Sequence, residues 1–197
     1  MSELLPRLHV ARHGETAWTL SGQRTGLTDL PLTERGERQA RRLGERLRGL
    51  AVARVFTSPL RRASRTCELA GFGGVAEPDA DLVEWDYGQY EGRRTREIVA
   101  ERPGWQLFRD GCPGGESPAD VAARADRVVA KVRALDADVL VFSSADFLRM
   151  LAARWLGLPP TAGAYFVLAT ASRGVLGYDH ERAEPAIHLW NETGPAD

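Results

Sequence analysis

Near its start the chain reads Leu8-His9-Val10-Ala11-Arg12-His13-Gly14-Glu15-Thr16. The apolar residues before Arg12 predict a short β-strand over residues 7–12, which stops before Gly14. Arg12 and His13 lie side by side where that strand ends, and a guanidinium can hold phosphate oxygens against a histidine ring nitrogen. Taken alone, the pair favours a simpler interpretation, two exposed polar residues at a strand end. The rest of the chain has to decide between the two.

The composition is typical of one soluble globular domain, which we predict to span residues 1–197: 43% of the residues are hydrophobic and 27% are charged. The net charge of −1 gives no general attraction for nucleic acids or acidic membranes. No apolar run approaches the roughly 20 residues that span a bilayer. We therefore expect no nucleic-acid partner and no membrane partner.

The two cysteines, Cys67 and Cys112, are in no metal-ligand spacing, which indicates reduced thiols. The first residues lack the basic and apolar regions of a secretory signal, so we expect a cytoplasmic protein. The four histidines are scattered along the chain, and this disfavours a multi-histidine metal site. A homo-oligomer is left open.

Apolar runs alternate with helical periodicities along the chain, and this alternation predicts a three-layer α/β/α sandwich with a mostly parallel central sheet. The loop over residues 14–31 is long for an irregular connection, which predicts a binding loop. Residues 71–78 predict a break in regular structure. Helices are expected from Thr33 to about residue 50, from Ser58-Pro59 onward, over residues 95–101 and from Ser117-Pro118 onward. Further strands are expected at residues 53–56, 139–142, 165–169, 174–178 and 186–190, the last three at least partly antiparallel.

Three of these strands end in polar residues: Arg12-His13, residues 58–62 and residues 143–146. Open α/β sheets bind ligands beyond the carboxyl ends of their strands. If the three strands are neighbours, the polar residues converge on one crevice, and a helix N-terminus beside arginines makes that crevice suited to an anion. A carboxylate from the acidic and aromatic segment 82–92, Glu84, can reach the same place as a proton donor.

At this point the sequence resembles a known family. Arg12-His13-Gly14-Glu15-Thr16 is similar to the signature of the histidine phosphatase superfamily, whose fold is phosphoglycerate mutase-like. Further similar segments are residues 26–33, 57–63, 82–92 and 115–117. The segments 84–88, 109–112 and 174–180 resemble the subgroup of sedoheptulose-1,7-bisphosphatase-like sugar phosphatases. The resemblance covers nearly the whole chain.

The resemblance implies a metal-independent, cofactor-free phosphatase of small phosphorylated metabolites, with sugar phosphates the favoured class. His13 would attack phosphorus and form a phosphohistidine. Arg12 and Arg62 would hold the equatorial oxygens, and Glu84 would protonate the leaving group and then deprotonate water. Further phosphate or substrate contacts implied are Thr19, Gln23 and Arg149.

The chain departs from the family after the strand at 139–142. A second catalytic histidine, a glycine and, in the sugar phosphatases, another histidine are expected there, and this chain has Ser144, Ala145 and Asp146. The Ser144 hydroxyl and the Ala145 amide can still donate to phosphate. Asp146 repels phosphate if it faces the pocket and is harmless if it caps the next helix.

Three interpretations stay open for this triplet. The protein is a slower phosphatase that keeps His13, Arg12, Arg62 and Glu84. It is a pseudoenzyme that binds a phosphorylated ligand without efficient turnover. Or the altered pocket serves a different chemistry. Phosphoglycerate mutase-type phosphoryl transfer ranks last, because the chain lacks the longer insertions associated with mutases.

Overall fold

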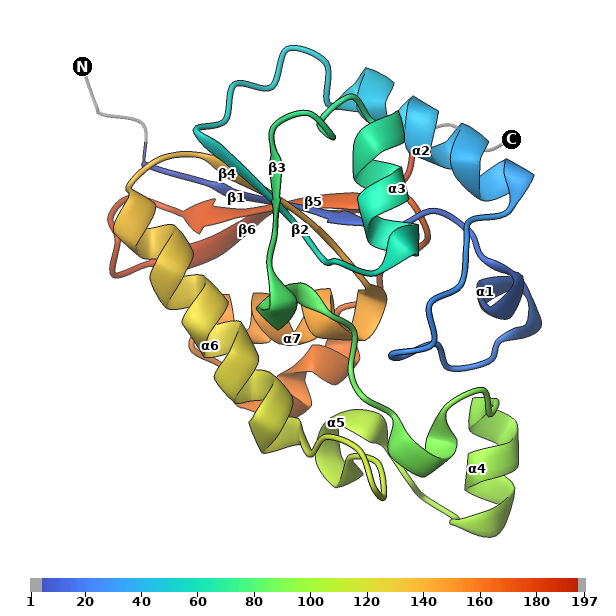
Figure 1. The fold of residues 1–197 in the computed structure, drawn as a ribbon. Helices are drawn as coiled ribbons and strands as arrows, with labels where there is room; N and C mark the ends of the chain where they lie inside the picture. Colours follow the sequence, from blue (N-terminus) through green and yellow to red (C-terminus); the bar gives the residue numbers. More distant parts are fainter. Residues whose placement is uncertain (1–4, 195–197) are drawn as a thin grey trace.

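The computed structural model describes residues 5–194, which form a six-stranded sheet with helices on both faces (Figure 1). The strand order is β3-β2-β4-β1-β5-β6. The first four strands in that order run parallel to one another, whereas β5 pairs antiparallel with both β1 and β6. The strands are β1 (Leu8–Arg12), β2 (Arg54–Thr57), β3 (Ala76–Pro78), β4 (Val139–Ser143), β5 (Arg173–Tyr178) and β6 (Pro185–Glu192).

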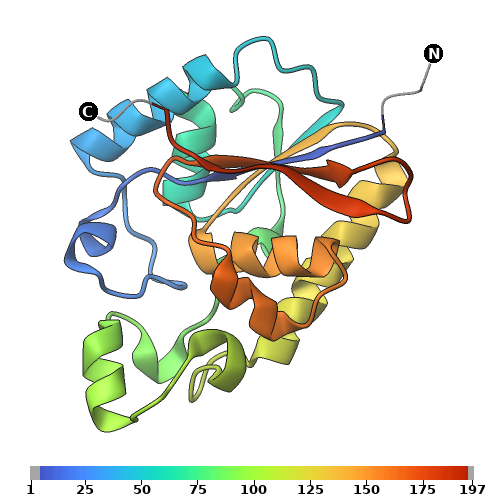
Figure 2. The same cartoon turned by 180° about the vertical axis from the view of Figure 1, so that it is seen from behind.

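The helices cover the two faces of the sheet, as Figures 1 and 2 show from opposite sides. Helices α2 and α3 lie on one face, and α6 and α7 lie on the other. The α-helices are α1 (Ala17–Ser21), α2 (Glu34–Arg46), α3 (Arg61–Leu69), α4 (Thr95–Glu101), α5 (Leu107–Asp110), α6 (Pro118–Leu135) and α7 (Ala145–Trp155). Within residues 5–194 the 3₁₀-helices are η1 (Ala80–Leu82), η2 (Gly88–Tyr90) and η3 (Pro160–Tyr165).

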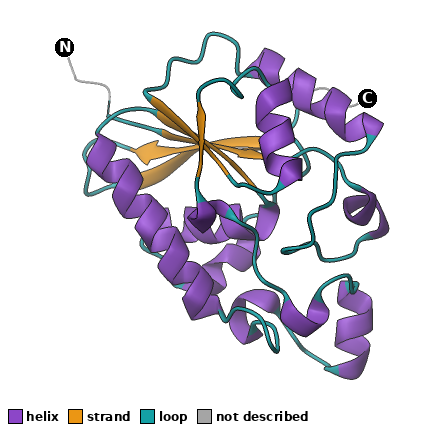
Figure 3. Ribbon diagram, viewed as in Figure 1, coloured by secondary structure: helices purple, strands orange, loops and turns teal. Residues whose placement is uncertain are grey.

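Strand β4 explains why two helical layers form. All five of its residues are buried, and successive side chains of a strand point to opposite faces. Val139 and Val141 belong to the core shared with α6 and α7, while Leu140 and Phe142 belong to the core shared with α2 and α3. The predicted three-layer α/β/α sandwich with a mostly parallel sheet is therefore confirmed (Figure 3).

Several local predictions were wrong. Residues 165–169 form no strand. Pro159 and Pro160 start the 3₁₀-helix η3, which extends to Tyr165. The loop 14–31 contains the short helix α1, which Thr16 and Thr19 close by a reciprocal capping box. The glycine-rich segment 71–78 ends in the edge strand β3.

The start of α3 also differs from the prediction. Ser58 and Pro59 precede the helix, Leu60 is its N-cap, and the first helical residue is Arg61. Ser117 and Pro118 do cap and begin α6 as predicted. No helix within residues 5–194 is both long and apolar enough to cross a membrane.

Candidate active site

The three polar strand ends meet at one edge of the sheet because β4 lies between β2 and β1. Backbone hydrogen bonds continue the pairing just beyond the strands. The His13 N–H donates to the Ser143 carbonyl at 3.0 Å, and the Ser58 N–H donates to the Phe142 carbonyl at 2.9 Å. The predicted convergence of these three segments is confirmed.

His13 is buried at the wall of a cavity of about 270 Å³. Its Nδ1 lies 2.7 Å from the Gly14 carbonyl, so Nδ1 carries the proton and Nε2 keeps its lone pair. Burial, and then the charges of Arg62 and Arg12, hold the pKa of His13 well below its ordinary 6.5. The ring is therefore neutral near pH 7, as a nucleophile requires.

The loop that carries His13 is held against α2 by two glycines. A Cβ on Gly14 would lie 2.4 Å from the Gly36 carbonyl oxygen, and a Cβ on Gly36 would lie 2.1 Å from the Glu15 carbonyl oxygen. Side chains at these positions would push the loop and the helix apart. This close approach fixes the backbone that follows His13.

Arg12 and Arg62 supply two guanidiniums beside His13, of which Arg12 is half-buried and Arg62 is buried. Arg12 lines the cavity and donates to the Leu168 carbonyl at 2.5 Å. Arg62 is fully buried behind the cavity wall, and its Nη atoms donate to carbonyls of residues 25, 26 and 28. The Nε of each is buried with no hydrogen-bond partner in the described part of the chain. Burial lowers the pKa of both groups, and the nearby carboxylate of Glu84 partly offsets that effect.

Glu84 occupies the N-terminus of α7. Its Oε1 accepts the backbone N–H of Phe147 at 2.8 Å and that of Trp85 at 2.9 Å, and its Oε2 accepts the N–H of Asp146 at 3.0 Å. Helix N-termini leave such N–H groups without intrahelical partners, so the carboxylate acts as a cap from another segment. Burial, and next the charge of Asp146, raise the pKa of Glu84 above its ordinary value.

The divergent triplet begins at Ser144, the N-cap residue of α7. Its hydroxyl is buried and has no hydrogen-bond partner among residues 5–194. Ser144 lies behind the cavity wall, whereas Ala145 and Asp146 line it. Because Glu84 already caps the N–H groups of α7, Asp146 does not take the capping role.

The Asp146 carboxylate is held at the cavity wall by three partners. Its Oδ1 accepts from Arg149 Nη1 at 2.7 Å. Its Oδ2 accepts from the Tyr87 hydroxyl at 2.7 Å and from Arg24 Nη1 at 3.3 Å. Burial by itself raises the pKa of Asp146, but Arg149, Arg24 and Tyr87 outweigh burial and leave the pKa lowered.

Thr19, Gln23 and Arg149 also line the cavity. The hydroxyl of Thr19 is engaged with the backbone of Thr16, and the Gln23 amide donates to the Gly92 carbonyl at 2.8 Å. These bonds order the loop 14–31. Direct contacts of the three side chains with phosphate stay a prediction.

Sequence reasoning missed Arg24, which connects the two halves of the site. Its guanidinium lies over the rings of Tyr87, at 5.2 Å, and Trp105, at 4.8 Å. Its Nη2 donates to the Thr95 hydroxyl at 3.2 Å. In the sequence Arg24 is one of many arginines, and no motif separates it from the solvated ones. Only packing identifies it.

A second cavity of about 590 Å³ adjoins the first and shares four wall residues with it: Arg24, Thr95, Asp146 and Arg149. The remaining wall is aromatic and polar and comes mainly from α5 and η3. It includes Trp105, Gln106, Phe108, Arg109, Thr161 and Tyr165. A phosphate ester with its phosphoryl group at His13 can extend its leaving group into this space.

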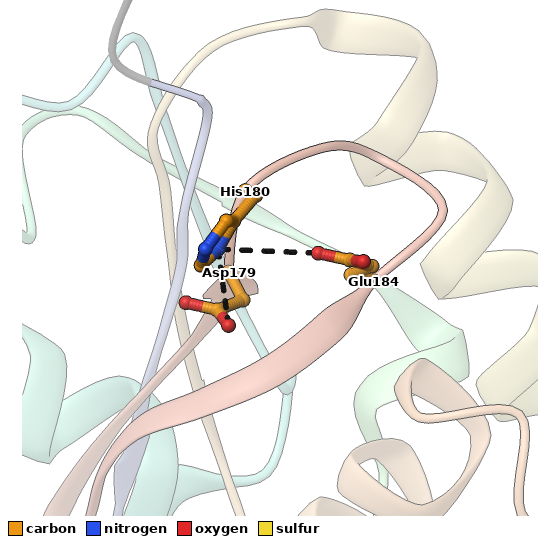
Figure 4. Close-up of side chains that lie close together, drawn as sticks. All are labelled: Asp179, His180 and Glu184. Atoms are coloured by element: carbon orange, nitrogen blue, oxygen red, sulfur yellow. Dashed lines mark ion pairs between the residues drawn. The ribbon is translucent and has the colours of Figure 1, made fainter.

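Another group of ionisable side chains lies at the turn between β5 and β6 (Figure 4). Asp179, His180 and Glu184 place one potential ligand atom each within 4.8 Å of one another, and all three are exposed. Within residues 5–194 this is the one group of three metal-ligating side chains. It shares no residue with the two cavities. The prediction that catalysis needs no metal stays a prediction.

Known families and proteins are similar to this chain over most of its length. The family model described as histidine phosphatase superfamily, branch 1, matches residues 8–193. The chain is 43% identical over 185 residues to an acid phosphatase of Mycobacterium tuberculosis, covering 92% of this chain and 91% of that protein. It is 39% identical over 196 residues to sedoheptulose 1,7-bisphosphatase of Saccharomyces cerevisiae, covering 80% and 70%. A solved structure of a Mycobacterium tuberculosis open reading frame product superposes with a TM-score of 0.92 at 40% identity, covering 96% and 99%.

Proposed function

Since the chain belongs to the histidine phosphatase superfamily, we propose that it is a metal-independent phosphomonoesterase that works through a phosphohistidine at His13. Its relatives named as phosphatases support a phosphoric monoester hydrolase. The finer statement, that His13 is the nucleophile and small phosphorylated metabolites such as sugar phosphates are the substrates, is our own. We also propose that residues 1–197 form a single domain of this family.

The observation that carries the proposal is the set of donors around His13 that lack acceptors. Arg12 Nε, Arg62 Nε and the Ser144 hydroxyl are buried without a partner among residues 5–194. Buried donors cost free energy unless they are paired, by about 1–3 kcal/mol each. A phosphoryl group bound in the cavity supplies acceptor oxygens to Arg12, which lines the cavity beside a free imidazole nitrogen, and Arg62 adds its positive charge from behind the wall. A phosphate ester is therefore the ligand that fits.

The reaction proceeds in two steps in this geometry. His13 Nε2 attacks phosphorus, while Nδ1–H keeps its bond to the Gly14 carbonyl, and the P–O bond to the leaving group breaks. Glu84 in its protonated form, which its raised pKa favours, gives its proton to the departing oxygen. The resulting carboxylate then takes a proton from water as the water oxygen attacks phosphorus, which releases phosphate and restores both residues.

Ser144 lowers the expected rate. Its short, uncharged hydroxyl stands where the family has a second histidine, and the loss of one donor to the transferring group costs about 2.7–4 kcal/mol in the transition state. This substitution motivates a second candidate function, binding of a phosphorylated ligand without efficient turnover. Mutase-type transfer stays the third, and isomer formation without phosphate release would identify it.

Phosphate release from a panel of sugar phosphates tests the proposal. We expect release by the wild-type protein and none by His13→Ala. His180→Ala, which removes an exposed histidine away from the cavities, is the matched control and keeps the wild-type rate. An acid-labile phosphoryl group trapped on the wild-type protein would locate the intermediate. Release that persists in His13→Ala would refute the phosphohistidine, and calorimetric binding without release would favour the pseudoenzyme.

A further inference from the structure

The arginines around the two cavities fall into two groups according to their ion pairs. Arg12 and Arg62, beside His13, form no ion pair with a carboxylate of the described chain. The arginines of the outer cavity are all paired: Arg149 and Arg24 with Asp146, and Arg109 with Asp110. The guanidiniums beside His13 are therefore not bound to a carboxylate of residues 5–194, whereas those of the outer cavity each contact one.

Asp146 is the one carboxylate among the four residues that the two cavities share, and it offsets one of the two positive charges of Arg24 and Arg149. Its two carboxylate oxygens contact Arg149 at 2.7 Å and Arg24 at 3.3 Å, and its side chain is only 10% exposed. Arg149 has no idle nitrogen, since Nε donates to the Gly163 carbonyl and Nη2 to the Ala164 carbonyl, both at 3.0 Å. A second phosphate group at this junction would approach a fixed carboxylate, and at this range like charges repel strongly.

The rest of the outer wall suits an uncharged group that carries hydroxyls. Tyr165, which is exposed, offers an aromatic side chain to the carbon skeleton, and Thr95, Gln106 and Thr161 offer polar side chains. Sugars and polyols present this combination of apolar faces and hydroxyl edges. The wall carries no excess of carboxylates that would favour a cationic leaving group.

From this arrangement we propose that Asp146 is a specificity-determining residue, which makes the enzyme select phosphomonoesters with an uncharged, hydroxylated leaving group over bisphosphates. The inference rests on the proposed phosphatase function for its catalytic readout. It concerns the ligand that the outer cavity accepts, and it differs from the reaction implied by the printed name of the yeast relative, a bisphosphatase.

Kinetics with a matched set of ligands test the inference: a hexose 1-phosphate, the corresponding 6-phosphate and the 1,6-bisphosphate. For the wild-type protein we expect kcat/KM for the better monophosphate to exceed that for the bisphosphate by about tenfold or more. Asp146→Asn should shift this ratio about tenfold toward the bisphosphate, because Arg24 and Arg149 are freed. The ratio cancels any change in the chemical step that the two ligands share.

Two further variants isolate the cause. Asp126→Asn removes a carboxylate that pairs with Arg154 on an exposed surface and should leave the ratio unchanged. Adding Arg24→Met to Asp146→Asn should abolish the gain for the bisphosphate. An unchanged ratio in a folded and active Asp146→Asn protein would overturn the inference, as would a wild-type preference for the bisphosphate.

Binding separates this inference from the proposed function. Calorimetry on His13→Ala, which lacks the nucleophile, compares the affinities for the monophosphates and the bisphosphate without turnover. Tighter binding of a monophosphate, with no hydrolysis by the wild-type protein, supports the inference and refutes the phosphatase. Hydrolysis with tighter binding of the bisphosphate refutes the inference and leaves the phosphatase standing. Binding of neither ligand refutes the inference.

Discussion

The Glu84 side chain binds the backbone of Asp146 and not its carboxylate: Glu84 Oε2 accepts the Asp146 N–H at 3.0 Å. The Asp146 carboxylate instead contacts Arg149 and Tyr87. One carboxyl group thus lies among backbone amides beside a negative neighbour, and the other lies among arginines. Environments of this kind push two pKa values apart, so that one group serves as the acid and the other stays ionised.

The first prediction concerns pH. Burial and the Asp146 charge raise the pKa of Glu84, and activity on alkyl phosphates is lost as pH rises through that pKa because the acid form disappears. Asp146→Asn removes one of the two causes, so the basic limb of the kcat/KM profile should move to lower pH. Asp126→Asn is the control. A basic limb at the same pH in both proteins would show that the charge of Asp146 does not raise the pKa of Glu84.

The second prediction separates proton donation from phosphate binding. Glu84→Gln keeps the size of the side chain and removes its acidic proton. We expect kcat on alkyl phosphates to fall by about 10²–10⁴-fold. The leaving group of p-nitrophenyl phosphate departs without protonation, so the rate of the first step with this substrate should fall much less. Equal losses on both substrates would contradict the assignment of Glu84 as the acid.

The third prediction concerns the divergent triplet. The combined change Ser144→His, Ala145→Gly and Asp146→His introduces a second imidazole donor, whose side chain is long enough to extend from position 144 toward the cavity. We expect kcat to rise by about 10²–10³-fold, the value of one such donor. Ser144→Ala, which removes the hydroxyl and adds no donor, serves as the reference and should not gain activity. Unchanged turnover in the triple variant would mean that the native residues already suffice.

The fourth prediction concerns stability. Arg124 on α6 is buried and pairs with Glu116 at 2.7 Å, while its Nη1 donates to the carbonyls of Asp81 and Val83. It therefore holds the segment that leads into Glu84. Arg124→Met should lower the free energy of unfolding by about 3–5 kcal/mol, since it leaves a carboxylate and carbonyls unpaired. Chemical denaturation measures this loss.

Arg127 provides the comparison for that measurement. It lies one turn further along α6 and pairs with Asp81, but its side chain is 58% exposed. Exposed ion pairs contribute little to stability. Arg127→Met should therefore leave the denaturation midpoint nearly unchanged. A similar loss in both variants would indicate that the charge of α6 matters and not the buried contacts of Arg124.

The strands and helices that define the fold were predictable where local patterns are strong. The continuous apolar run of β4 and the Ser117-Pro118 start of α6 both appear in the structure. The strand expected at residues 165–169 failed because this segment pairs with no strand of the sheet, and its apolar residues Tyr165 and Val167 are exposed. Edge strand β3 was missed because its glycine-rich approach predicts a break, and pairing with β2 alone makes it a strand.

The site residues, too, were predictable where they lie in local sequence motifs. His13, Arg12 and Glu84 were found from motifs, and the structure places them around one cavity. Arg24 and its ion pair with Asp146 were not predictable, because the two residues lie more than a hundred positions apart in the chain. The sequence left two positions open for the Asp146 side chain, facing the pocket or capping α7. In the structure Glu84 binds the N–H groups at the start of α7, and the Asp146 carboxylate lies at the cavity wall, where it is paired with arginines.

Strand β1 pairs with β4, and residues 8 and 139 face each other across that pair. The cavity exists only when chain segments from both ends of the molecule have joined, and such distant pairings form late and slowly in folding. Recovery of activity after dilution from denaturant thus reports completion of the whole sheet. A partly folded chain with native helices has no nucleophile in place, so enzymatic assay is a stricter measure of refolding than helical circular dichroism.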